Sequence, residues 1–318
     1  MVGKAKRKDQ KKCRKCGKPA VIFRDYEGMA LCRHHFIDSI EKRVKRVIRK
    51  YNMISPGDKI GVALSGGKDS ATALYFMKMI TEPRRDVELI AISIDEGIKG
   101  SRDLALKKAT ELAKKLGVKQ YTYSYKKELG MSLDQKVKKD QIEEGGVCGV
   151  CGISRRWVLN RMARKHKLTK LCYGMNLDDE AESIMMNYVR GDIPRASRLG
   201  PVTSFSTKKK GGQMFIPRIK PLRWVPEKEI ELYARLRGLP FRPKECKYRG
   251  GLRVDVEKAL DTLEKKHVGL LFTVVNTFDR MLPGIKKTVE YGEQQIKKCK
   301  KCGEPGSHPI CKACEVWK

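Results

Sequence analysis

The sequence predicts an α/β protein with a doubly wound, mostly parallel sheet and a small zinc-ribbon module at each end. Two continuous apolar runs, 59–64 and 87–95, are typical of strands buried on both faces. A segment with apolar residues at helical spacing follows each run, and this strand–helix–strand order implies a parallel sheet with right-handed crossovers. Closely spaced cysteines near both termini predict the two modules.

The composition indicates a folded protein with a polyanionic partner. Of the 318 residues, 70 are Lys or Arg and 37 are Asp or Glu, which gives a formal net charge of +33, while 40% are hydrophobic. Nucleic acid is the favoured partner, ahead of a membrane surface. The sequence has neither a run of about 18 apolar residues nor a signal peptide, so we expect a cytoplasmic protein without a membrane partner.

In a reducing compartment, the eleven cysteines favour metal ligands over disulfides. A C-x2-C pair and a C-x2-H pair near the N-terminus, and a C-x2-C-x8-C-x2-C array near the C-terminus, each supply the ligands of one tetrahedral Zn²⁺. Disulfides fit the N-terminal set less well, because an odd cysteine would be left over. We expect a first zinc at Cys13, Cys16, Cys32 and His35, and a second at Cys299, Cys302, Cys311 and Cys314. His34 and His308 are not needed as ligands.

The segment 38–51 predicts an amphipathic basic helix. Its apolar residues recur at helical spacing, and the opposite face carries Lys42, Arg43, Lys45, Arg46, Arg49 and Lys50. Such a face is often only solvated, but beside a zinc module in a strongly basic chain it favours contact with phosphates. Residues 55–58 contain Pro and Gly and break the chain before the core.

The stretch 62–70 (VALSGGKDS) predicts an anion-binding loop between a strand and a helix. Backbone N–H groups of the turn and the positive end of the helix point at one place, the glycines let an anion approach, and serine hydroxyls add donors. The spacing differs from the Walker pattern G-x-x-x-x-G-K-[ST]. A turn without a ligand is the plainer alternative. The residues expected at the anion are Ala63, Leu64, Ser65, Gly66, Gly67, Asp69 and Ser70.

Two further strands, 87–95 and 170–174, also end in residues suited to a ligand. Ligands bind at the carboxyl ends of strands in a doubly wound sheet. Asp179 is a candidate to hold Mg²⁺ or to orient a nucleotide; alternatively, Asp178 or Asp179 is only the N-cap of the next helix, and we expect one of the two to be so. The residues expected near a nucleotide are Ile94, Gly174, Asn176 and Asp179.

The remaining cysteines are Cys148, Cys151, Cys172 and Cys246. The first two form a C-x-x-C pair before a helix that carries Arg155, and such a pair alone fits a redox dithiol, a zinc knuckle or two ligands of a cluster. Cys172 lies in an apolar strand and is expected to be an inert core residue. Cys246 has charged neighbours, which argue against an apolar niche.

These motifs together resemble a known family. The stretch 65–70 resembles the PP-loop, S-G-G-x-D-S, of the N-type ATP pyrophosphatases. With the C-x-x-C-G-x-x-R-R segment at 148–156, the G-x-N-x-D-D segment at 174–179 and zinc-ligand pairs at both ends, the chain resembles the tRNA 2-thiouridine synthetases of the TtuA type. The related TtcA-type thiolases lack the double zinc layout.

The resemblance implies a PP-loop, Rossmann-like core that uses ATP and Mg²⁺ to replace the C2 oxygen of a tRNA uridine by sulfur. The loop with Ser65 would hold the β and γ phosphates, Arg155 would contact the α phosphate, and Asp179 would orient ATP or its metal. The resemblance also implies one [4Fe-4S] cluster, held by Cys148, Cys151 and Cys246, with one iron left open. A persulfide relay by the cysteine pair is the alternative.

The expected partners are tRNA and a sulfur donor, either sulfide or a ubiquitin-like thiocarboxylate carrier, and we expect a homodimer. Two other functions compete: another PP-loop tRNA-modifying enzyme, such as a lysidine synthetase or an amidotransferase, and a zinc-dependent RNA-binding protein with a vestigial nucleotide loop. The expected segments are an N-terminal zinc finger (1–36), a basic linker helix (37–55), the ATPase core with the iron–sulfur site (56–250), a helical extension (251–294) and a C-terminal zinc finger (295–318).

The second half of the chain contributes a basic loop and three helices to this layout. The segment 190–220, rich in Arg, Lys, Gly and Ser with 208–212 (KKKGG) at its centre, is expected to be an exposed loop that RNA orders. A helix is expected at 226–237, with Pro at its start and Gly after its end. Two more are expected at 254–263 and 268–281.

Overall fold

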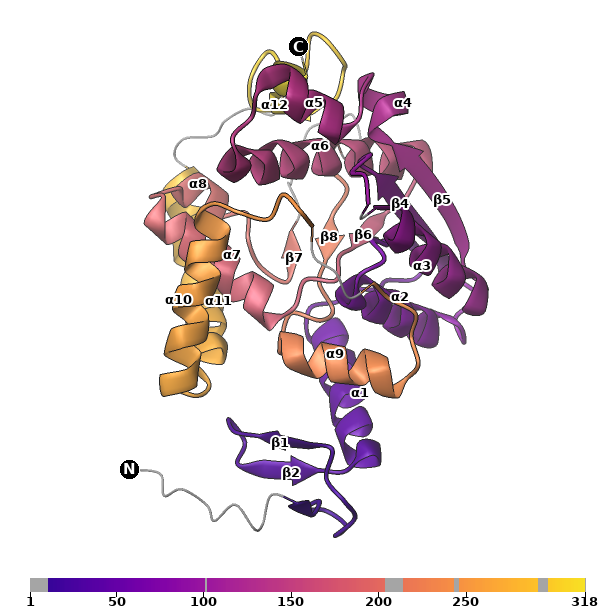
Figure 1. Ribbon diagram of the computed structural model, residues 1–318, viewed down its shortest axis with the longest axis vertical. Coiled ribbons are helices and arrows are strands. Elements are labelled where there is room, and N and C mark those ends of the chain that lie inside the picture. Colours follow the sequence, from indigo (N-terminus) through magenta and orange to yellow (C-terminus); the bar gives the residue numbers. More distant parts are fainter. Residues whose placement is uncertain (1–10, 101, 204–213, 243–245, 291–296, 318) are drawn as a thin grey trace.

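The computed structural model describes residues 11–100, 102–203, 214–242, 246–290 and 297–317. Its centre is a six-stranded sheet in the order β5-β4-β3-β6-β8-β7, in which every pairing is parallel except that of β7 with β8 (Figure 1). The predicted doubly wound, mostly parallel sheet is confirmed. Its strands are β3 (Lys59–Ala63), β4 (Glu88–Asp95), β5 (Lys119–Ser124), β6 (Lys170–Cys172), β7 (Val202–Thr203) and β8 (Arg218–Ile219).

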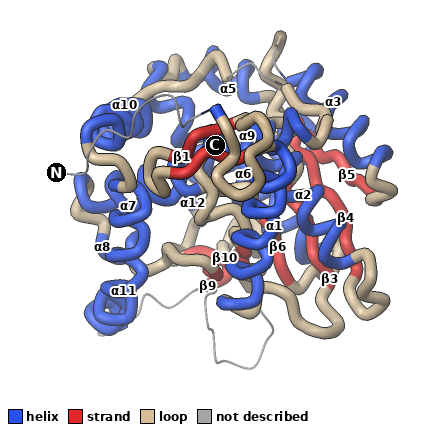
Figure 2. Tube along the Cα trace, turned by 90° about the horizontal axis from the view of Figure 1, so that it is seen from below, coloured by secondary structure: helices blue, strands red, loops and turns tan. Residues whose placement is uncertain are grey.

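The order of the strands creates a switch point between β3 and β6. The chain adds β4 and β5 on one side of β3 and then returns to place β6 on the other side. Figure 2 shows β3, β4 and β5 side by side. The carboxyl ends of β3 and β6 therefore lie next to each other with connections that leave in opposite directions, which is where such sheets bind ligands.

Helices cover both faces of the sheet, each over its own apolar cluster. One cluster joins β3 to the buried sides of four helices, and the other joins β4 and β6 to three. The first four are α1 (Arg33–Lys50), α2 (Lys68–Thr81), α3 (Arg102–Lys115) and α9 (Glu227–Leu236), and the other three are α4 (Tyr125–Leu129), α5 (Leu133–Asp140) and α6 (Glu144–Lys165).

Helix α6 starts well before the point that the sequence indicates. It runs from Glu144, so the C-x-x-C pair lies inside the helix and not before it. The sequence did not predict this start because glycines occupy positions 145, 146, 149 and 152, and glycine has low helix propensity. The prediction that a helix carries Arg155 is confirmed.

A third apolar cluster joins a group of helices beside the sheet. Helix α7 follows β6 directly, and the two predicted late helices pack against it. Buried ion pairs add to this packing, because Glu180 of α7 contacts Lys220 at 2.6 Å and Arg223 at 3.1 Å. The group consists of α7 (Leu177–Val189), α8 (Ile193–Ala196), α10 (Leu252–Lys266) and α11 (Leu270–Glu290).

The prediction of one continuous exposed loop at 190–220 was wrong for its described part. Asp192 accepts a hydrogen bond from the N–H of Arg195 and so caps α8, while β7 pairs with β8 at the sheet edge. The lysine and glycine run at 208–212 lies outside the described residues. Among the helices that are described, none is both long and apolar enough to cross a membrane.

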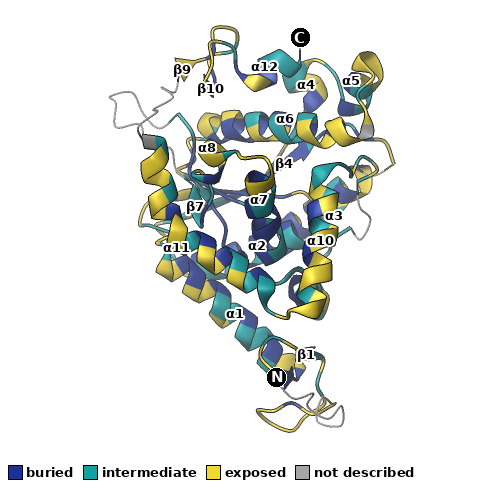
Figure 3. Cartoon of the chain, turned by 90° about the vertical axis from the view of Figure 1, so that its left-hand side faces the viewer, coloured by how far each residue is buried: buried dark blue, intermediate teal, exposed yellow. Residues whose placement is uncertain are grey.

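The two cysteine-rich ends lie at opposite ends of the molecule (Figures 1 and 3). The N-terminal one is the hairpin β1 (Ile22–Arg24) and β2 (Met29–Leu31), which leads into α1. The C-terminal one contains β9 (Lys297–Lys298), β10 (Pro305–Gly306) and α12 (Lys312–Val316), which packs on α6. The expected boundary at residue 36 falls within α1, so the N-terminal ligands and the basic helix are continuous.

Candidate functional site: a nucleotide loop, an acidic group and three sets of cysteines

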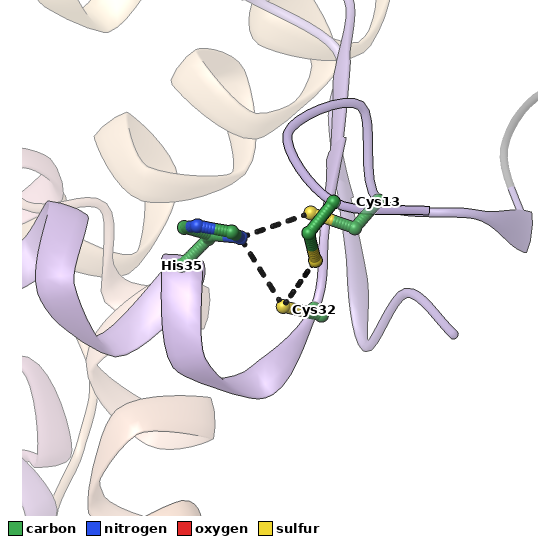
Figure 4. A group of neighbouring side chains, drawn as sticks. Cys13, Cys32 and His35 are labelled. Atoms are coloured by element: carbon green, nitrogen blue, oxygen red, sulfur yellow. Dashed lines mark hydrogen bonds between the residues drawn. The ribbon is translucent and has the colours of Figure 1, made fainter. Parts of the chain in front are cut away.

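The N-terminal ligand set converges in space. The ligand atoms of Cys13, Cys16, Cys32 and His35 all lie within 4.8 Å of one another. His35 Nδ1 is 3.3 Å from the Sγ of Cys13 and 3.4 Å from that of Cys32, while the Sγ atoms of Cys16 and Cys32 are 3.7 Å apart (Figure 4). His34 is exposed, as expected. Thiolates and an imidazole at this spacing suit one tetrahedral Zn²⁺.

Hydrogen bonds from the backbone and from His35 favour the thiolate form of Cys13. Burial alone would raise the pKa of Cys13, but N–H groups of Cys32 and Lys15 and the imidazole of His35 lower this pKa to about 6. A thiolate is the form that binds metal, so the fold favours the required protonation state.

The C-terminal ligand set has the same construction. The thiols of Cys299, Cys302, Cys311 and Cys314 lie within 4.8 Å of one another, and His308 is exposed and outside the group. The pKa of Cys299 is lowered to about 6, because the backbone N–H groups around it outweigh its burial. Both sets fit the metal that their sequence spacing predicts.

The loop after β3 has the shape of an anion cradle. Gly66 has a φ of +84°, and a Cβ atom there would lie 2.0 Å from the carbonyl oxygen of Ala105, so only glycine fits. The Oγ atoms of Ser65 and Ser70 are 2.9 Å apart, and the N–H of Ser65 donates to Ser70 Oγ at 3.1 Å. Helix α2 starts directly after Gly67, which places its positive end at the loop.

Arg102 holds the backbone of this loop by hydrogen bonds. It is buried and donates to the carbonyl oxygens of Ser65, at 2.8 Å, and Ile94. Its Nε lies 2.7 Å from Glu96 Oε2. Ile94 is buried, and its carbonyl oxygen accepts this bond from Arg102. The backbone N–H and carbonyl oxygen of Leu64 form hydrogen bonds with residues of β4. Contact of these two residues with a nucleotide stays a prediction.

The end of β6 lies directly against the loop. A Cβ atom on Gly174 would lie 2.6 Å from the carbonyl oxygen of Asp69, so glycine is needed for this approach. Asn176 Nδ2 donates to Asp69 Oδ1 at 3.1 Å. The structure therefore brings the predicted loop and the predicted G-x-N-x-D-D segment together at the switch point.

The N-cap of α7 corrects one expectation. The cap is Asn176, whose Oδ1 accepts from the N–H of Asp179 at 2.8 Å, while Asp179 Oδ2 accepts from the N–H of Asn176 at 3.3 Å. Neither Asp178 nor Asp179 is the cap, because Asn176, an equally good capping residue, already stands at the position before the helix. Asp178 instead accepts from the N–H of Glu227 at 2.8 Å.

Asp179 belongs to an acidic group that is partly balanced by one arginine. Arg253 of α10 lies 2.5 Å from Asp179 Oδ1 and 2.8 Å from Glu182 Oε2. Burial raises the pKa of Asp179 to about 6 and that of Glu182 to about 7, against the lowering effect of Arg253. Burial also raises the pKa of Asp178 to about 6. Raised carboxyl pKa values beside a phosphate loop are typical of functional groups.

The three cysteines assigned to a cluster differ in their surroundings. Cys151 is buried, which raises its pKa, while Arg155 Nη2 donates to its sulfur at 3.3 Å and lowers it. Cys148 is exposed and its thiol donates to the carbonyl oxygen of Tyr248 at 2.9 Å, which brings it to the segment that follows Cys246. The described part of the chain gathers no set with 4.8 Å spacing here. Cys172 is fully buried with a raised pKa, as expected of a core cysteine.

Comparisons with known proteins agree with this geometry. A family model described as a PP-loop domain matches residues 37–248, and one described as the N-terminal LIM domain of the 2-thiouridine synthetase TtuA matches residues 12–37. The tRNA 2-thiolation protein NcsA of Haloferax volcanii is 35% identical over 316 residues, 96% of this chain and 97% of the relative. The chain belongs to the PP-loop family of tRNA 2-thiolation proteins.

Two further relatives show the range of this family. The tRNA-5-methyluridine(54) 2-sulfurtransferase of Pyrococcus horikoshii is 30% identical over 308 residues, which cover 96% of this chain and 93% of the relative. The solved structure of the U34-tRNA thiolase NcsA from Methanococcus maripaludis, which contains a [4Fe-4S] cluster, has a TM-score of 0.80, 32% identity and 97% coverage of both chains.

Several residues of the site were not predicted from the sequence. Arg253 was missed because it meets Asp179 only through the packing of α10 on α7, whereas Glu182, three residues after Asp179 on α7, could have been found from helical spacing. Lys68 lies inside the loop motif, and its Nζ contacts Asp69 at 3.2 Å and Glu227 at 2.5 Å. Lys68 stands at the variable position x of the S-G-G-x-D-S pattern, so the pattern did not point to it. A lysine at the start of a phosphate-binding helix is, however, a signal by which it could have been found.

Proposed function

We propose that this protein uses ATP to adenylate the C2 oxygen of a tRNA uridine and then replaces that oxygen with sulfur. The observation that supports this most is the contact of the PP-loop with the G-x-N-x-D-D segment at the switch point of the sheet, through Asn176 and Asp69. It occurs in a chain that is similar along nearly its whole length to tRNA thiolation proteins.

The chemistry at the nucleotide follows from the loop. Ser65, the loop N–H groups and the start of α2 would hold the β and γ phosphates, so that the uridine O2 attacks the α phosphate and pyrophosphate leaves. The adenylated oxygen then departs as AMP when sulfur attacks C2. Catalysis by this chain is positioning of the two reactants and stabilisation of charge on phosphorus.

Asp69 and Asp179 are the proposed ligands of the Mg²⁺ that accompanies ATP. Both are carboxylates on the phosphate side of the switch point, and carboxylates together with phosphate oxygens are the usual ligands of this ion. Arg253 would shift from Asp179 toward phosphate when the ion binds. Because burial raises the pKa of Asp179 to about 6, metal binding should weaken as the pH falls through that value.

Arg155 has surroundings that suit a second role. Its Nε donates to Glu96 Oε1 at 3.0 Å and its Nη2 to Cys151 Sγ at 3.3 Å, and the Glu96 carboxylate raises the pKa of Arg155 further above its ordinary value. We propose that it stabilises the charge of Cys151 once that sulfur is bound to iron, because burial alone raises the pKa of this cysteine. Contact with the α phosphate stays a prediction.

The cysteine set fits a [4Fe-4S] cluster better than a single metal ion. Thiolates bound to different irons of one cluster stand farther apart than those on one zinc, and Cys148, Cys151 and Cys246 are not gathered at the close spacing of the two end sites. Three thiolates leave one iron free, which supplies a Lewis-acidic position for the sulfur nucleophile. Arg155 donates to the sulfur of Cys151 and would stabilise its charge, while the hydroxyl of Tyr125 donates to the carbonyl oxygen of Cys151.

The two end modules and α1 are proposed to bind zinc and tRNA. An open hollow on α1 is lined by Lys42, Arg46, Arg49 and Lys50, without an acidic residue in its lining. Such a face neutralises backbone phosphates, and the target base must leave its stack to expose C2 to the site. We place the protein in the cytoplasm, as a homodimer that takes sulfur from sulfide or from a thiocarboxylate carrier.

The test is tRNA-dependent formation of AMP and pyrophosphate from ATP by the whole protein. Ser65→Ala should lower the rate by roughly 10-fold or more, the effect of one hydrogen bond to a charged group. Thr262→Ala removes a comparable hydroxyl from the exposed face of α10 and should leave the rate unchanged. Absence of AMP formation with any tRNA would favour an RNA-binding protein with a vestigial loop. AMP formation without thiolation would favour a lysidine synthetase or amidotransferase type.

A further inference from the structure

We propose that Trp317, at the end of the C-terminal module, is a positioning residue that holds Cys151 in place for the iron–sulfur cluster. The inference rests on the proposed function, because it takes Cys151 as a ligand. It assigns the C-terminal module to the cluster rather than to tRNA alone.

The helix segment that carries the cysteine pair is weak by composition. Residues 144–152 of α6 include four glycines, which lose the most backbone freedom in a helix. The segment also begins without a side-chain cap. Other parts of the protein must therefore fix its conformation, since the ligands of a cluster have to keep their relative positions.

The first support is a hydrogen-bond route through Ser154. Trp317 Nε1 donates to Ser154 Oγ at 2.7 Å, and Ser154 Oγ donates to the carbonyl oxygen of Val150 at 2.6 Å. Ser154 is fully buried, so its hydroxyl depends on these two partners. Val150 precedes Cys151, and the route thus ends at the ligand's own turn of helix.

The second support is an aromatic route through Tyr125. The rings of Trp317 and Tyr125 are 5.7 Å apart at 84°, an edge-to-face contact. Tyr125 is fully buried, and its hydroxyl donates to the carbonyl oxygen of Cys151 at 2.9 Å. The ammonium of Lys136, which is buried and paired with Asp140 at 2.6 Å, lies 5.8 Å from the Trp317 ring and closes this niche.

Both routes meet at Cys151 and start from the residue next to the zinc-binding helix α12. Zinc held by Cys311 and Cys314 would fix α12, and Trp317 is the C-cap residue of that helix. Cys148 is different, because it is exposed and contacts the segment after Cys246. The C-terminal module therefore fixes Cys151, whereas Cys148 is held by the segment that follows Cys246.

The experiment compares Trp317→Phe, which keeps a ring and removes the N–H, with Trp317→Ala, which removes both. The whole protein is reconstituted anaerobically with iron and sulfide, and the decay of the visible cluster absorbance is followed after addition of an iron chelator. Zinc per chain and ATP affinity are measured on the same samples. His308→Ala, an exposed residue of the same module, is the matched control.

We expect the rate of cluster loss to rise roughly 2- to 10-fold in Trp317→Phe, the effect of one neutral hydrogen bond. In Trp317→Ala it should rise roughly 10- to 100-fold, because the aromatic contact is lost as well. Zinc content, ATP affinity and the His308→Ala protein should be unchanged. The double variant Ser154→Ala/Trp317→Phe should raise the rate of cluster loss by less than the product of the two single-variant factors, because both substitutions break the same hydrogen-bond route.

Equal decay rates in wild type, Trp317→Phe and Trp317→Ala would overturn the inference and leave the proposed function standing. A wild-type protein that forms no cluster would overturn both. If Trp317→Ala loses its zinc, the test rests on Trp317→Phe. A rate of cluster loss equal to that of the wild type in Trp317→Phe would then contradict the proposal. Independent effects of Ser154→Ala and Trp317→Phe would contradict the hydrogen-bond route.

Discussion

The two ends of this protein have nearly the same ligand chemistry but are attached to the core in different ways. The N-terminal module docks on α9 through buried charges: Arg24 lies 2.7 Å from Glu229, and both side chains are less than 5% exposed. Tyr26 also contacts Glu229. The C-terminal module docks on α6 mainly through apolar residues and the indole hydrogen bond of Trp317, with one ion pair at 3.3 Å between Arg164 and the buried Glu304.

The comparison shows that the spacing of the ligands predicts a metal site but does not predict which part of the protein the metal stabilises. The N-terminal site continues into α1, whose basic face is turned to solvent, so in the proposed function a metal there would order a surface for tRNA. The C-terminal site packs on the helix that carries Cys148 and Cys151, so in the proposed function a metal there would order the cysteines of the cluster. Loss of one zinc should therefore not resemble loss of the other.

The largest effects are expected from breaking each metal site in turn. Cys13→Ser and Cys311→Ser should each remove one zinc per chain, since metal binding contributes on the order of 10 kcal/mol to the folding of such modules. Cys13→Ser should weaken tRNA binding and keep the cluster, whereas Cys311→Ser should lose both zinc and cluster. Elemental analysis for zinc and iron, with a tRNA binding assay, measures this. Identical losses in the two variants would contradict the division of roles.

The next largest effect concerns the docking of the N-terminal module. Glu229→Ala removes the buried partner of Arg24 and leaves it only Glu27 and Ser39, which should lower the free energy of unfolding by about 3 kcal/mol. Glu231→Ala, on the exposed face of the same helix, removes only a surface pair with Arg235 and should cost less than about 1 kcal/mol. Denaturant unfolding compares the two. A similar, small change in both would show that the charges do not hold the module.

A smaller effect is expected on the basic face of α1. Arg46→Ala and Arg49→Ala should each weaken tRNA binding roughly 10-fold and lower the slope of log affinity against log salt by about 1. Cluster content should stay unchanged, because this face lies away from α6. Titrations at several salt concentrations measure the slope. A slope equal to that of the wild type would exclude these arginines from the phosphate contacts.

The smallest effect is a shift of a pH profile at the acidic group. Arg253 lowers the pKa of Asp179, which burial raises to about 6, so Arg253→Gln should raise it further. Activity that needs the Asp179 carboxylate falls as the pH drops through this pKa, and the acid limb should move upward by up to about 1 pH unit. Arg249, in the loop just before α10, pairs with Glu257 and not with Asp179, so Arg249→Gln is the control. An acid limb at the wild-type position in Arg253→Gln would show that Arg253 does not affect the ionisation of Asp179.

Local patterns in the sequence predicted much of this structure. The strand-to-helix loop at 62–70 and both four-ligand sets are encoded by neighbouring residues, whose spacing fixes their geometry. The N-cap was missed because Asn176 and Asp179 form a capping box with unusual residue types. The start of α6 was missed because its glycines hide a helix that tertiary packing stabilises.

Contacts between distant elements could not be predicted in this way. Arg253 and Asp179 are 74 positions apart, and Trp317 and Ser154 are 163 apart. Nothing in either local pattern indicates the other partner, because each pair depends on how α10 packs on α7 or α12 on α6. The same reason kept Arg155 from being placed: the sequence puts it on a helix, and only the fold puts it between Glu96 and Cys151.

The most direct test of the central claim is mass spectrometry of nucleosides from tRNA treated with the purified protein. Anaerobic protein reconstituted with iron, given ATP, Mg²⁺ and sulfide, should convert a uridine to 2-thiouridine, and fragments of the tRNA should give its position. The same protein freed of iron, and Cys246→Ala, should form none above background while still binding ATP. Full 2-thiouridine formation by iron-free protein would contradict the account, because sulfide would then attack the adenylated uridine without the help of iron.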